Sequence, residues 1–212
     1  MRLILELRSE LCVTNFNPLI ESLSMNVDID KTVEELFAMI ANSGEADYIG
    51  ENVTQLEHMC QAAEFAEEQG NDDEVILGAL FHDIGHFCAE YDSEHDMDGL
   101  GHIAHDKVGA DYLRDRGFSE KIARLVESHV EAKRYLCAAK PGYHAKLSEA
   151  SAKTLEFQGG PMSADEVAKF EADPYFKEII KVRAWDEMAK IENKPLPDLE
   201  RYKEKAKAHL RN

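Results

Sequence analysis

Apolar residues recur along this chain with the spacing of amphipathic helices, whereas the strict alternation typical of β-strands is scarce. One such segment follows Asp30, a predicted N-cap, carries apolar residues at positions i, i+3, i+4 and i+7 from Val33, and stops near Gly44. A second segment spans residues 56–66. We therefore expect an all-α protein, built as a helical bundle with short connections.

A third segment, from about Asp73 to Cys88, is apolar over most of its surface, which is typical of a helix buried at the centre of its domain. The acidic, glycine-containing stretch 90–101 that follows is predicted to be a loop. Further helices are expected at 103–116, at 119–135 with a cap at Ser119, after a capping box at Ser163, from Pro174 to about 190, and from 198 to about 210.

Composition narrows the class of protein. A chain of 212 residues with 44% hydrophobic residues suits one globular domain, and 42 acidic against 24 basic residues give a net charge of -18. That charge opposes binding to nucleic acid or to an anionic membrane surface. The four cysteines form no Cys-x-x-Cys pair, and no segment is long and apolar enough for a signal peptide or a membrane span. We expect a cytoplasmic protein whose partner is a small molecule.

The third segment also carries polar groups that a buried helix rarely holds. His82 and His86 share a face, and Asp83 points about 100 degrees away from them, so the set can ligate one metal and bridge to a second. The alternative is a hydrogen-bonded core histidine beside a satisfied carboxylate. Because a buried carboxylate is costly without a compensating cation, we favour metal ligation for His82 and Asp83 and leave His86 open.

Other predicted helices supply partners of the same chemical type. His129 and Lys133 interrupt an otherwise apolar stripe, and Arg183 shares a face with Asp186, although that pair alone would also suit a plain salt bridge. The candidate ligands come from five helices and are His58, His82, Asp83, His105, His129 and Asp186. Four imidazoles and two carboxylates are enough for two metals, and suit iron, manganese or zinc better than magnesium or calcium. The other histidines, His95, His102, His144 and His209, are expected to be exposed to solvent.

The run Phe81-His-Asp-Ile-Gly-His86, preceded by Glu57-His58, resembles the HD-domain superfamily. Longer stretches are similar to the mixed-valence diiron oxygenases of that superfamily, which cleave 2-amino-1-hydroxyethylphosphonate. These stretches are Tyr48-Ile-Gly-Glu51, His105-Asp-Lys-Val-Gly-Ala-Asp-Tyr-Leu113, Ser128-His-Val-Glu-Ala-Lys-Arg-Tyr-Leu136, Lys153-Thr-Leu-Glu-Phe-Gln-Gly-Gly-Pro-Met162 and Arg183-Ala-Trp-Asp-Glu187. The resemblance covers residues 27–212 as a single HD-type helical domain and leaves residues 1–26 as an N-terminal extension without an assigned role.

The resemblance implies an activity as well as a fold. It implies that the six candidate ligands bind two iron ions (Fe2+ and Fe3+) with Asp83 as the bridge, and that O2 is the co-substrate. The products would be glycine and phosphate. It further implies a phosphonate site made of His86, Lys133, Ser151, Thr154 and Arg183. Tyr48 would cover the open iron and Glu51 would receive the substrate ammonium, so that Tyr48, Glu51, His86 and Lys133 lie next to the reacting groups.

Alternatives stay open at this stage. An HD-domain phosphohydrolase with one metal needs only His58, His82, Asp83 and Asp186, although His105 and His129 favour a second metal. A metal-stabilised module without activity is a further alternative. Within the oxygenases, a trimethylated substrate competes with the primary amine. Glu51 favours the primary amine, because a trimethylammonium group has no N–H to donate and prefers an aromatic cage.

Overall fold

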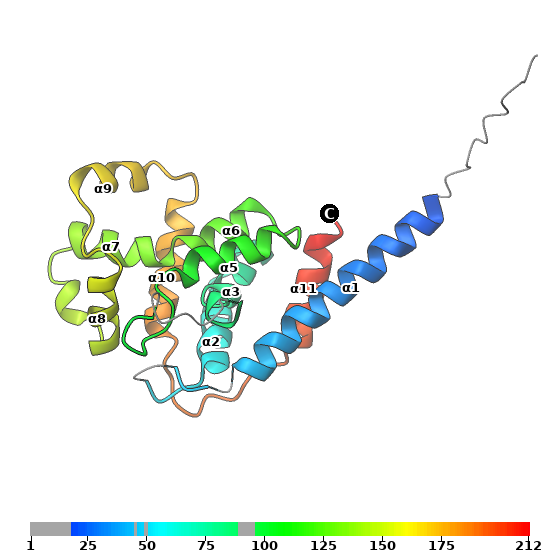
Figure 1. The fold of residues 1–212 in the computed structure, drawn as a ribbon, viewed down its shortest axis with the longest axis horizontal. Coiled ribbons are helices and arrows are strands. Elements are labelled where there is room, and N and C mark those ends of the chain that lie inside the picture. The colour runs from blue at the N-terminus through cyan, green and yellow to red at the C-terminus, as the bar shows by residue number, and fades with distance from the viewer. Residues whose placement is uncertain (1–17, 45, 49–50, 89–95) are drawn as a thin grey trace, which may run out of the picture.

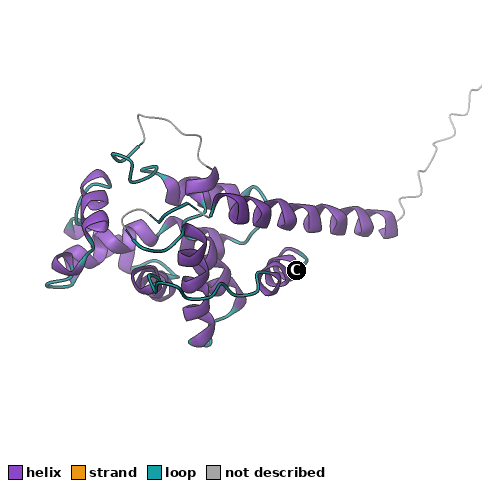
Figure 2. Cartoon of the chain, turned by 90° about the horizontal axis from the view of Figure 1, so that it is seen from below, coloured by secondary structure: helices purple, strands orange, loops and turns teal. Residues whose placement is uncertain are grey.

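The computed structural model describes residues 18–44, 46–48, 51–88 and 96–212, with residues 18–28 described by their backbone alone. Within these residues the regular structure is helical, and β-pairing is limited to the isolated bridges Asp47–Thr54 and Asp96–His102 (Figure 2). The predicted all-α class is confirmed. No helix in this described part has both the length and the apolar character needed to cross a membrane.

The helices follow one another with short connections. In chain order they are α1 (Pro18–Ser43), α2 (Gln55–Glu68), α3 (Asp73–Phe81), α4 (Gly85–Cys88), α5 (His105–Arg114), α6 (Glu120–Glu127), α7 (His129–Ala139), the 3-10 turn η1 (His144–Lys146), α8 (Glu149–Phe157), α9 (Ala164–Glu171), α10 (Phe176–Met188) and α11 (Glu200–Leu210).

Helix α3 lies at the centre of the bundle (Figure 1). Every residue from Val75 to Phe81 is buried, and α3 packs against α2, α6, α10 and α11. Its apolar surface thus has neighbours around it, as the sequence predicted. Local capping agrees with the pattern as well, because the side chains of Ser119 and Ser163 accept hydrogen bonds from the backbone N–H groups of Ile122 and Glu166.

The predicted N-cap at Asp30 is wrong. Helix α1 begins at Pro18 and continues through Asp30, whose carboxylate instead accepts from Arg211 at 2.7 Å. Nothing between residues 19 and 43 is a glycine or a proline, and extending a helix costs far less than nucleating a new one. The end of α1 packs beside α11, while its beginning extends away from the bundle (Figure 1). The helix also crosses the expected boundary at residues 26 and 27 without a break, and that boundary stays a prediction.

Two predicted helices are each divided. The expected helix from Asp73 to Cys88 ends at Phe81, and a turn of i to i+3 hydrogen bonds precedes α4. The expected helix 119–135 is divided at Ser128 into α6 and α7. Neither 82–84 nor Ser128 contains a Gly or Pro, although Gly85 directly follows the first break. Packing around the polar residues at these positions overrides local helix propensity. Both breaks place a histidine, His82 or His129, at a helix end.

Candidate metal centre

Four buried histidines direct the same ring nitrogen toward a common centre. Each Nδ1 lies within hydrogen-bond distance of a backbone carbonyl oxygen. These distances are 2.9 Å from His58 to Ala189, 2.8 Å from His82 to Ala79, 2.8 Å from His105 to His102 and 2.7 Å from His129 to Val126. A carbonyl oxygen only accepts, so Nδ1 carries the proton and Nε2 carries a lone pair. A backbone contact that fixes the tautomer in this way is typical of metal-binding histidines.

The four Nε2 atoms meet in two pairs. His58 and His82 are 2.9 Å apart at Nε2, and His105 and His129 are 3.0 Å apart. With Nδ1 protonated in each neutral ring, lone pairs face each other in both pairs, so a proton or a metal cation is needed between them. Against the effect of burial, Asp186 and Asp83 raise the pKa of His58 to about 9 and Asp83 raises the pKa of His129, so without metal each pair has one ring that can hold this proton. Four imidazoles that converge with a carboxylate on one buried centre are also donors that a metal ion can bind in place of those protons.

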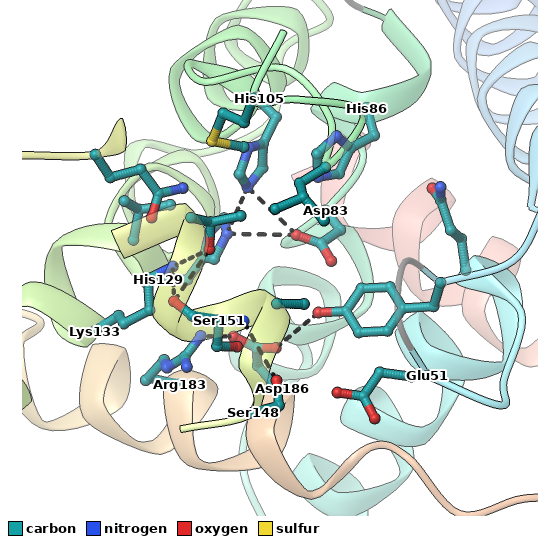
Figure 3. A pocket seen from close by; sticks show the side chains of 18 of the residues that line it. Glu51, Asp83, His86, His105, His129, Lys133, Ser148, Ser151, Arg183 and Asp186 are labelled. Carbon is teal, nitrogen blue, oxygen red and sulfur yellow. Dashed lines mark hydrogen bonds and ion pairs between the residues drawn. The ribbon is translucent and has the colours of Figure 1, made fainter. Parts of the chain in front are cut away.

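Asp83 lies between the two pairs, and its two oxygens face different pairs. Figure 3 shows one of these oxygens facing His105 and His129. Oδ2 is 3.3 Å from His82 Nε2 and 3.5 Å from His58 Nε2, whereas Oδ1 is 3.4 Å from His129 Nε2 and 3.6 Å from His105 Nε2. Burial alone would raise its pKa, but the surrounding imidazoles lower the pKa of Asp83 well below the usual range. An ionised carboxylate in this position can bridge two cations.

Asp186 adds a second carboxylate to the first pair. Its Oδ1 is 3.4 Å from His58 Nε2 and 3.9 Å from His82 Nε2, while its Oδ2 pairs with Arg183. One position thus has two imidazoles and two carboxylates, and the other has His105, His129 and the second oxygen of Asp83. A ring nitrogen of His86 also comes within 4.8 Å of donor atoms of Asp83 and His105.

Glycines bring the helices of this centre into close contact. A Cβ on Gly85 would lie 1.7 Å from the carbonyl oxygen of His105, so α4 and α5 touch through their backbones and hold His105 beside Asp83. His86 stacks on the ring of His105 with centroids 4.0 Å apart. Gly101, at a φ of +94°, also lies against His86, because a Cβ at this position would be 2.5 Å from an atom of the ring. Burial and His105 lower the pKa of His86 to about 3, so this ring is neutral.

A pocket of about 650 Å³, its open mouth included, leads to the centre. The predicted site residues that line it are Tyr48, Glu51, Asp83, His86, His105, His129, Lys133, Ser151, Thr154, Arg183 and Asp186. His58 and His82, which are fully buried, do not line it. The structure thus brings every residue singled out from the sequence either to the pocket or to the metal centre at its base.

Two cations approach the pocket from one side. Lys133 is 4% exposed, and its Nζ donates to Thr154 Oγ1 at 2.8 Å and to the carbonyl of Ser151 at 3.4 Å. Burial and the nearby Arg183 lower the pKa of Lys133 to about 7. The side chain is therefore only partly protonated near neutral pH, and an anion bound beside it would raise its pKa and stabilise the charged ammonium form.

Arg183 is held on two sides and unpaired on the third. Its Nη1 donates to Asp186, and its Nε donates to Glu187 at 2.9 Å and to the hydroxyl of Tyr143 at 3.2 Å. Nη2 is buried and has no hydrogen-bond partner. A buried donor on a charged group is costly when unpaired, so this nitrogen indicates a place for an anionic ligand.

Tyr48 covers the first histidine pair. Its ring stacks on that of His58, with centroids 3.8 Å apart and an interplanar angle of 16°, and its hydroxyl donates to Asp186 Oδ1 at 3.5 Å. Burial and the two carboxylates Asp186 and Asp83 raise the pKa of Tyr48 well above its ordinary value. The phenol is therefore neutral at physiological pH.

Glu51 lies on the opposite side of the pocket from Lys133 (Figure 3) and is already paired, because its carboxylate accepts from Lys190. Sequence reasoning gave no role to Lys190 or to several other lining residues: Gln55, Met97, Leu100, Val130, Ser148, Ala150 and Gln158. For Gln55 a signal existed, since it precedes His58 by one helical turn. Its Oε1 is buried without a partner.

The remaining histidines differ in their surroundings. His144 is exposed, as expected, and His95 lies outside the described residues. His102 is half-buried, and besides holding His105 through its carbonyl it accepts at Nδ1 from the N–H of Ala104 at 3.1 Å. The expectation of an exposed His209 is wrong: the packing of α11 brings its ring against Phe118, and its Nε2 accepts from the backbone N–H of Ser119 at 3.0 Å.

Residues 56–173 match the family model described as HD domain, and this range contains His58, His82, Asp83, His105 and His129. The chain belongs to the HD-domain family. Asp186 lies outside the matched range and completes the donor set from α10. The HD-domain match and the helical bundle therefore agree with the fold expected from the sequence.

Three relatives of this HD-domain protein cover most of its length. A glycine-betaine-forming 1-hydroxy-2-(trimethylamino)ethylphosphonate dioxygenase of Leisingera caerulea is 46% identical, over 78% of this chain and 84% of its own. A hydroxymethylphosphonate dioxygenase of Gimesia maris is 37% identical, over 87% of this chain and 90% of its own. An uncharacterized protein of Acanthamoeba polyphaga mimivirus is 40% identical, over 91% of this chain and 84% of its own.

The two relatives with an assigned activity are both named as dioxygenases of hydroxyphosphonates, and neither is named as a hydrolase. The predicted resemblance to the HD-domain oxygenases is confirmed. Of the alternatives left open by the sequence, the relatives favour an oxygenase over a phosphohydrolase or an inactive module.

Proposed function

We propose that this protein is a diiron dioxygenase that cleaves the carbon–phosphorus bond of 1-hydroxyphosphonates, with 2-amino-1-hydroxyethylphosphonate as its substrate. One observation carries the proposal: Asp83 lies between two pairs of facing Nε2 atoms, and Arg183, whose buried Nη2 has no hydrogen-bond partner, lines the pocket that leads to them. The first feature suits two cations and the second suits an anion. Relatives named as hydroxyphosphonate dioxygenases give additional support.

The overall reaction balances with no further reagent. The substrate and one O2 together contain the atoms of glycine and phosphate. The C–H and C–P bonds of the hydroxyl-bearing carbon break, new C–O and P–O bonds form, and the four electrons released by the substrate reduce O2. Irons held by His58, His82, His105, His129, Asp83 and Asp186 would supply the binding and reduction of O2.

The protein's own groups orient the substrate. The Arg183 Nη2 and the Lys133 ammonium bind the phosphonate, and the hydroxyl of Thr154 holds Lys133 in place for that contact. His86 is neutral and lies beside the centre, where it can exchange a hydrogen bond with the hydroxyl of the substrate. Fixing both ends of so small a molecule presents its reacting carbon to the metal centre in one orientation.

Tyr48 limits the access of water. Its ring covers His58 and its hydroxyl reaches Asp186, so the first metal position is shielded from the mouth of the pocket. Excluding water strengthens the interactions between charged groups inside the pocket and suppresses side reactions.

The amine end distinguishes the two candidate substrates. Glu51 and the unpartnered Oε1 of Gln55 are hydrogen-bond acceptors, which suit the N–H groups of a primary ammonium. Among the described lining residues Tyr48 is the only Phe, Tyr or Trp, whereas a trimethylammonium group favours several faces of such rings. The pocket therefore favours the primary amine. The trimethylated compound is the second candidate, because the relative at 46% identity is named for it.

Steady-state oxygen consumption by iron-loaded protein tests this proposal with three compounds: the primary amine, its trimethylated form and hydroxymethylphosphonate. We expect the highest kcat/KM for the primary amine. A higher value for the trimethylated compound would replace the proposed substrate and keep the reaction class. Phosphate release without oxygen consumption would replace the dioxygenase with a hydrolase.

The identity of the metal is tested separately. Metal analysis should give two irons per chain, and electron paramagnetic resonance should detect a mixed-valence signal that substrate perturbs. A single tightly bound zinc per chain, with no such signal, would contradict the diiron proposal.

A further inference from the structure

The amine end of the pocket holds a cation of the protein's own. We propose that Lys190 is a displaceable counter-ion of Glu51 and that it determines which hydroxyphosphonates the pocket accepts, according to the tail, which is the substituent on their hydroxyl-bearing carbon. This inference rests on the proposed function. Lys190 Nζ donates to the carboxylate of Glu51, where the ammonium of the substrate is expected. Lys190 is therefore an internal competitor of an amine-bearing substrate.

The backbone of Lys190 is fixed on both sides. The preceding carbonyl, that of Ala189, accepts from Nδ1 of the buried His58 at 2.9 Å. The following residue, Ile191, exchanges two hydrogen bonds with the side chain of Gln61, of 2.9 Å and 3.0 Å. Because these contacts hold both neighbouring residues on α2, only the side chain of Lys190 is free to change position.

The surroundings of Nζ offer it more than one partner. Besides Glu51, it lies 3.4 Å from Ser148 Oγ and 5.8 Å from the centre of the Tyr48 ring. The side chains of Lys190 and Glu51 are 21% and 19% exposed, so water reaches both partners of the pair. Partly exposed ion pairs contribute about 0.2–1 kcal/mol, which a substrate ammonium can replace.

The charge of the tail then decides the affinity of each substrate. While Lys190 neutralises Glu51, an uncharged tail such as the hydrogen of hydroxymethylphosphonate enters without disturbing the pair. A primary ammonium must displace Lys190 toward Ser148 or solvent, and this displacement lowers its affinity. A trimethylammonium cannot take over the hydrogen bond, since it has no N–H. Removing the charge of Lys190 should therefore help the primary amine selectively.

The substitution Lys190→Met tests this, because it keeps the length of the side chain and removes the charge. Lys194→Met is the matched control: Lys194 pairs with Glu64 at 2.9 Å, the two side chains are 23% and 19% exposed, and its Nζ lies 5.3 Å from the Phe65 ring, outside the pocket. Calorimetry of iron-loaded protein without oxygen gives the Kd of 2-amino-1-hydroxyethylphosphonate and of hydroxymethylphosphonate.

We expect Lys190→Met to lower the Kd of the amine by about threefold to fivefold while leaving that of hydroxymethylphosphonate within about twofold, and Lys194→Met to change neither. The effect should vanish in the Glu51→Gln background. An unchanged ratio of the two Kd values, an effect that persists in Glu51→Gln, or binding of neither compound would overturn the inference. Since the readout is binding, tight binding without oxygen consumption would instead contradict the proposed function alone.

Discussion

His58 and His82 meet at their Nε2 atoms, 2.9 Å apart, although each ring already uses its Nδ1 proton on a backbone carbonyl. The second pair, His105 and His129, repeats the arrangement at 3.0 Å. Two facing lone pairs would repel each other inside a buried centre, so a proton must lie in each pair when no metal is bound, and Asp186 and Asp83 raise the pKa of His58 to about 9 accordingly. The centre therefore holds positive charge in either form, as protons or as metal ions.

Removing the metals should destabilise the folded protein. At free metal concentrations about 100 times the Kd, binding contributes about 2.7 kcal/mol, which for a chain of this size corresponds to a fall in Tm of roughly 5–10 °C on chelation. Thermal unfolding of chelated and iron-loaded protein measures this difference, and adding iron back is its control. Equal Tm values for the two forms would contradict the claim that metal binding at this centre stabilises the fold.

The bridging position of Asp83 predicts the effect of Asp83→Asn. An amide presents only one oxygen, so one histidine pair would face an N–H2 group instead of a carboxylate oxygen. We expect the iron content to fall below two per chain and kcat to fall by more than about 100-fold. Asp111→Asn is the control, since that carboxylate is 73% exposed on the same helix as His105. Normal iron content in Asp83→Asn would show that this residue is no bridge.

The unpartnered Nη2 of Arg183 predicts a loss of phosphonate affinity in Arg183→Lys. A lysine cannot hold Asp186 and Glu187 and still present a further N–H to the pocket. One lost charge-assisted hydrogen bond costs about 1.5–3 kcal/mol, so KM should rise by roughly 10-fold to 100-fold. Arg201→Lys, at an arginine whose side chain is 41% exposed, should leave KM unchanged. Since Arg183 also contacts Asp186, iron content is measured alongside, and an unaltered KM at full iron content would remove Arg183 from the phosphonate site.

Lys133 predicts the pH dependence of kcat/KM. Burial and Arg183 lower its pKa to about 7, against the weaker opposite effect of Asp186 and Asp83, and bound metal cations would lower it further. The ammonium is charged below that pKa and neutral above it, so kcat/KM, which reports the free metal-loaded enzyme, should fall as pH rises through a value at or below about 7. Lys133→Arg keeps its charge over this pH range and should lack this fall. The ionisation of the substrate affects both proteins equally, so comparing their pH profiles removes its contribution. The same fall in Lys133→Arg would assign it to another group.

Much of this centre could be predicted from sequence because buried helices rarely tolerate polar residues. His82 with Asp83, and His129 with Lys133, interrupt apolar stripes, and the structure brings all four to one place. The division at Ser128 carried no such signal, since no Gly or Pro adjoins it, and the division at 82–84 is marked only by Gly85 at the start of α4. Packing of the ligands decides those breaks, and packing is a tertiary property.

The contacts that long charged side chains make in the pocket could not be predicted from the sequence. The helix predicted from Pro174 was expected to run to about residue 190, yet α10 ends at Met188, and Lys190 reaches the pocket from the segment beyond it to pair with Glu51. That pair joins residues 139 positions apart, and no local pattern encodes it.

The central claim is the use of O2 to cleave a carbon–phosphorus bond, and one measurement tests it directly. Iron-loaded protein is supplied with 2-amino-1-hydroxyethylphosphonate, and oxygen consumed and phosphate released are measured together, with and without air. The account predicts one O2 consumed for each phosphate released and no phosphate in the absence of oxygen. Phosphate released at the same rate without oxygen would contradict it.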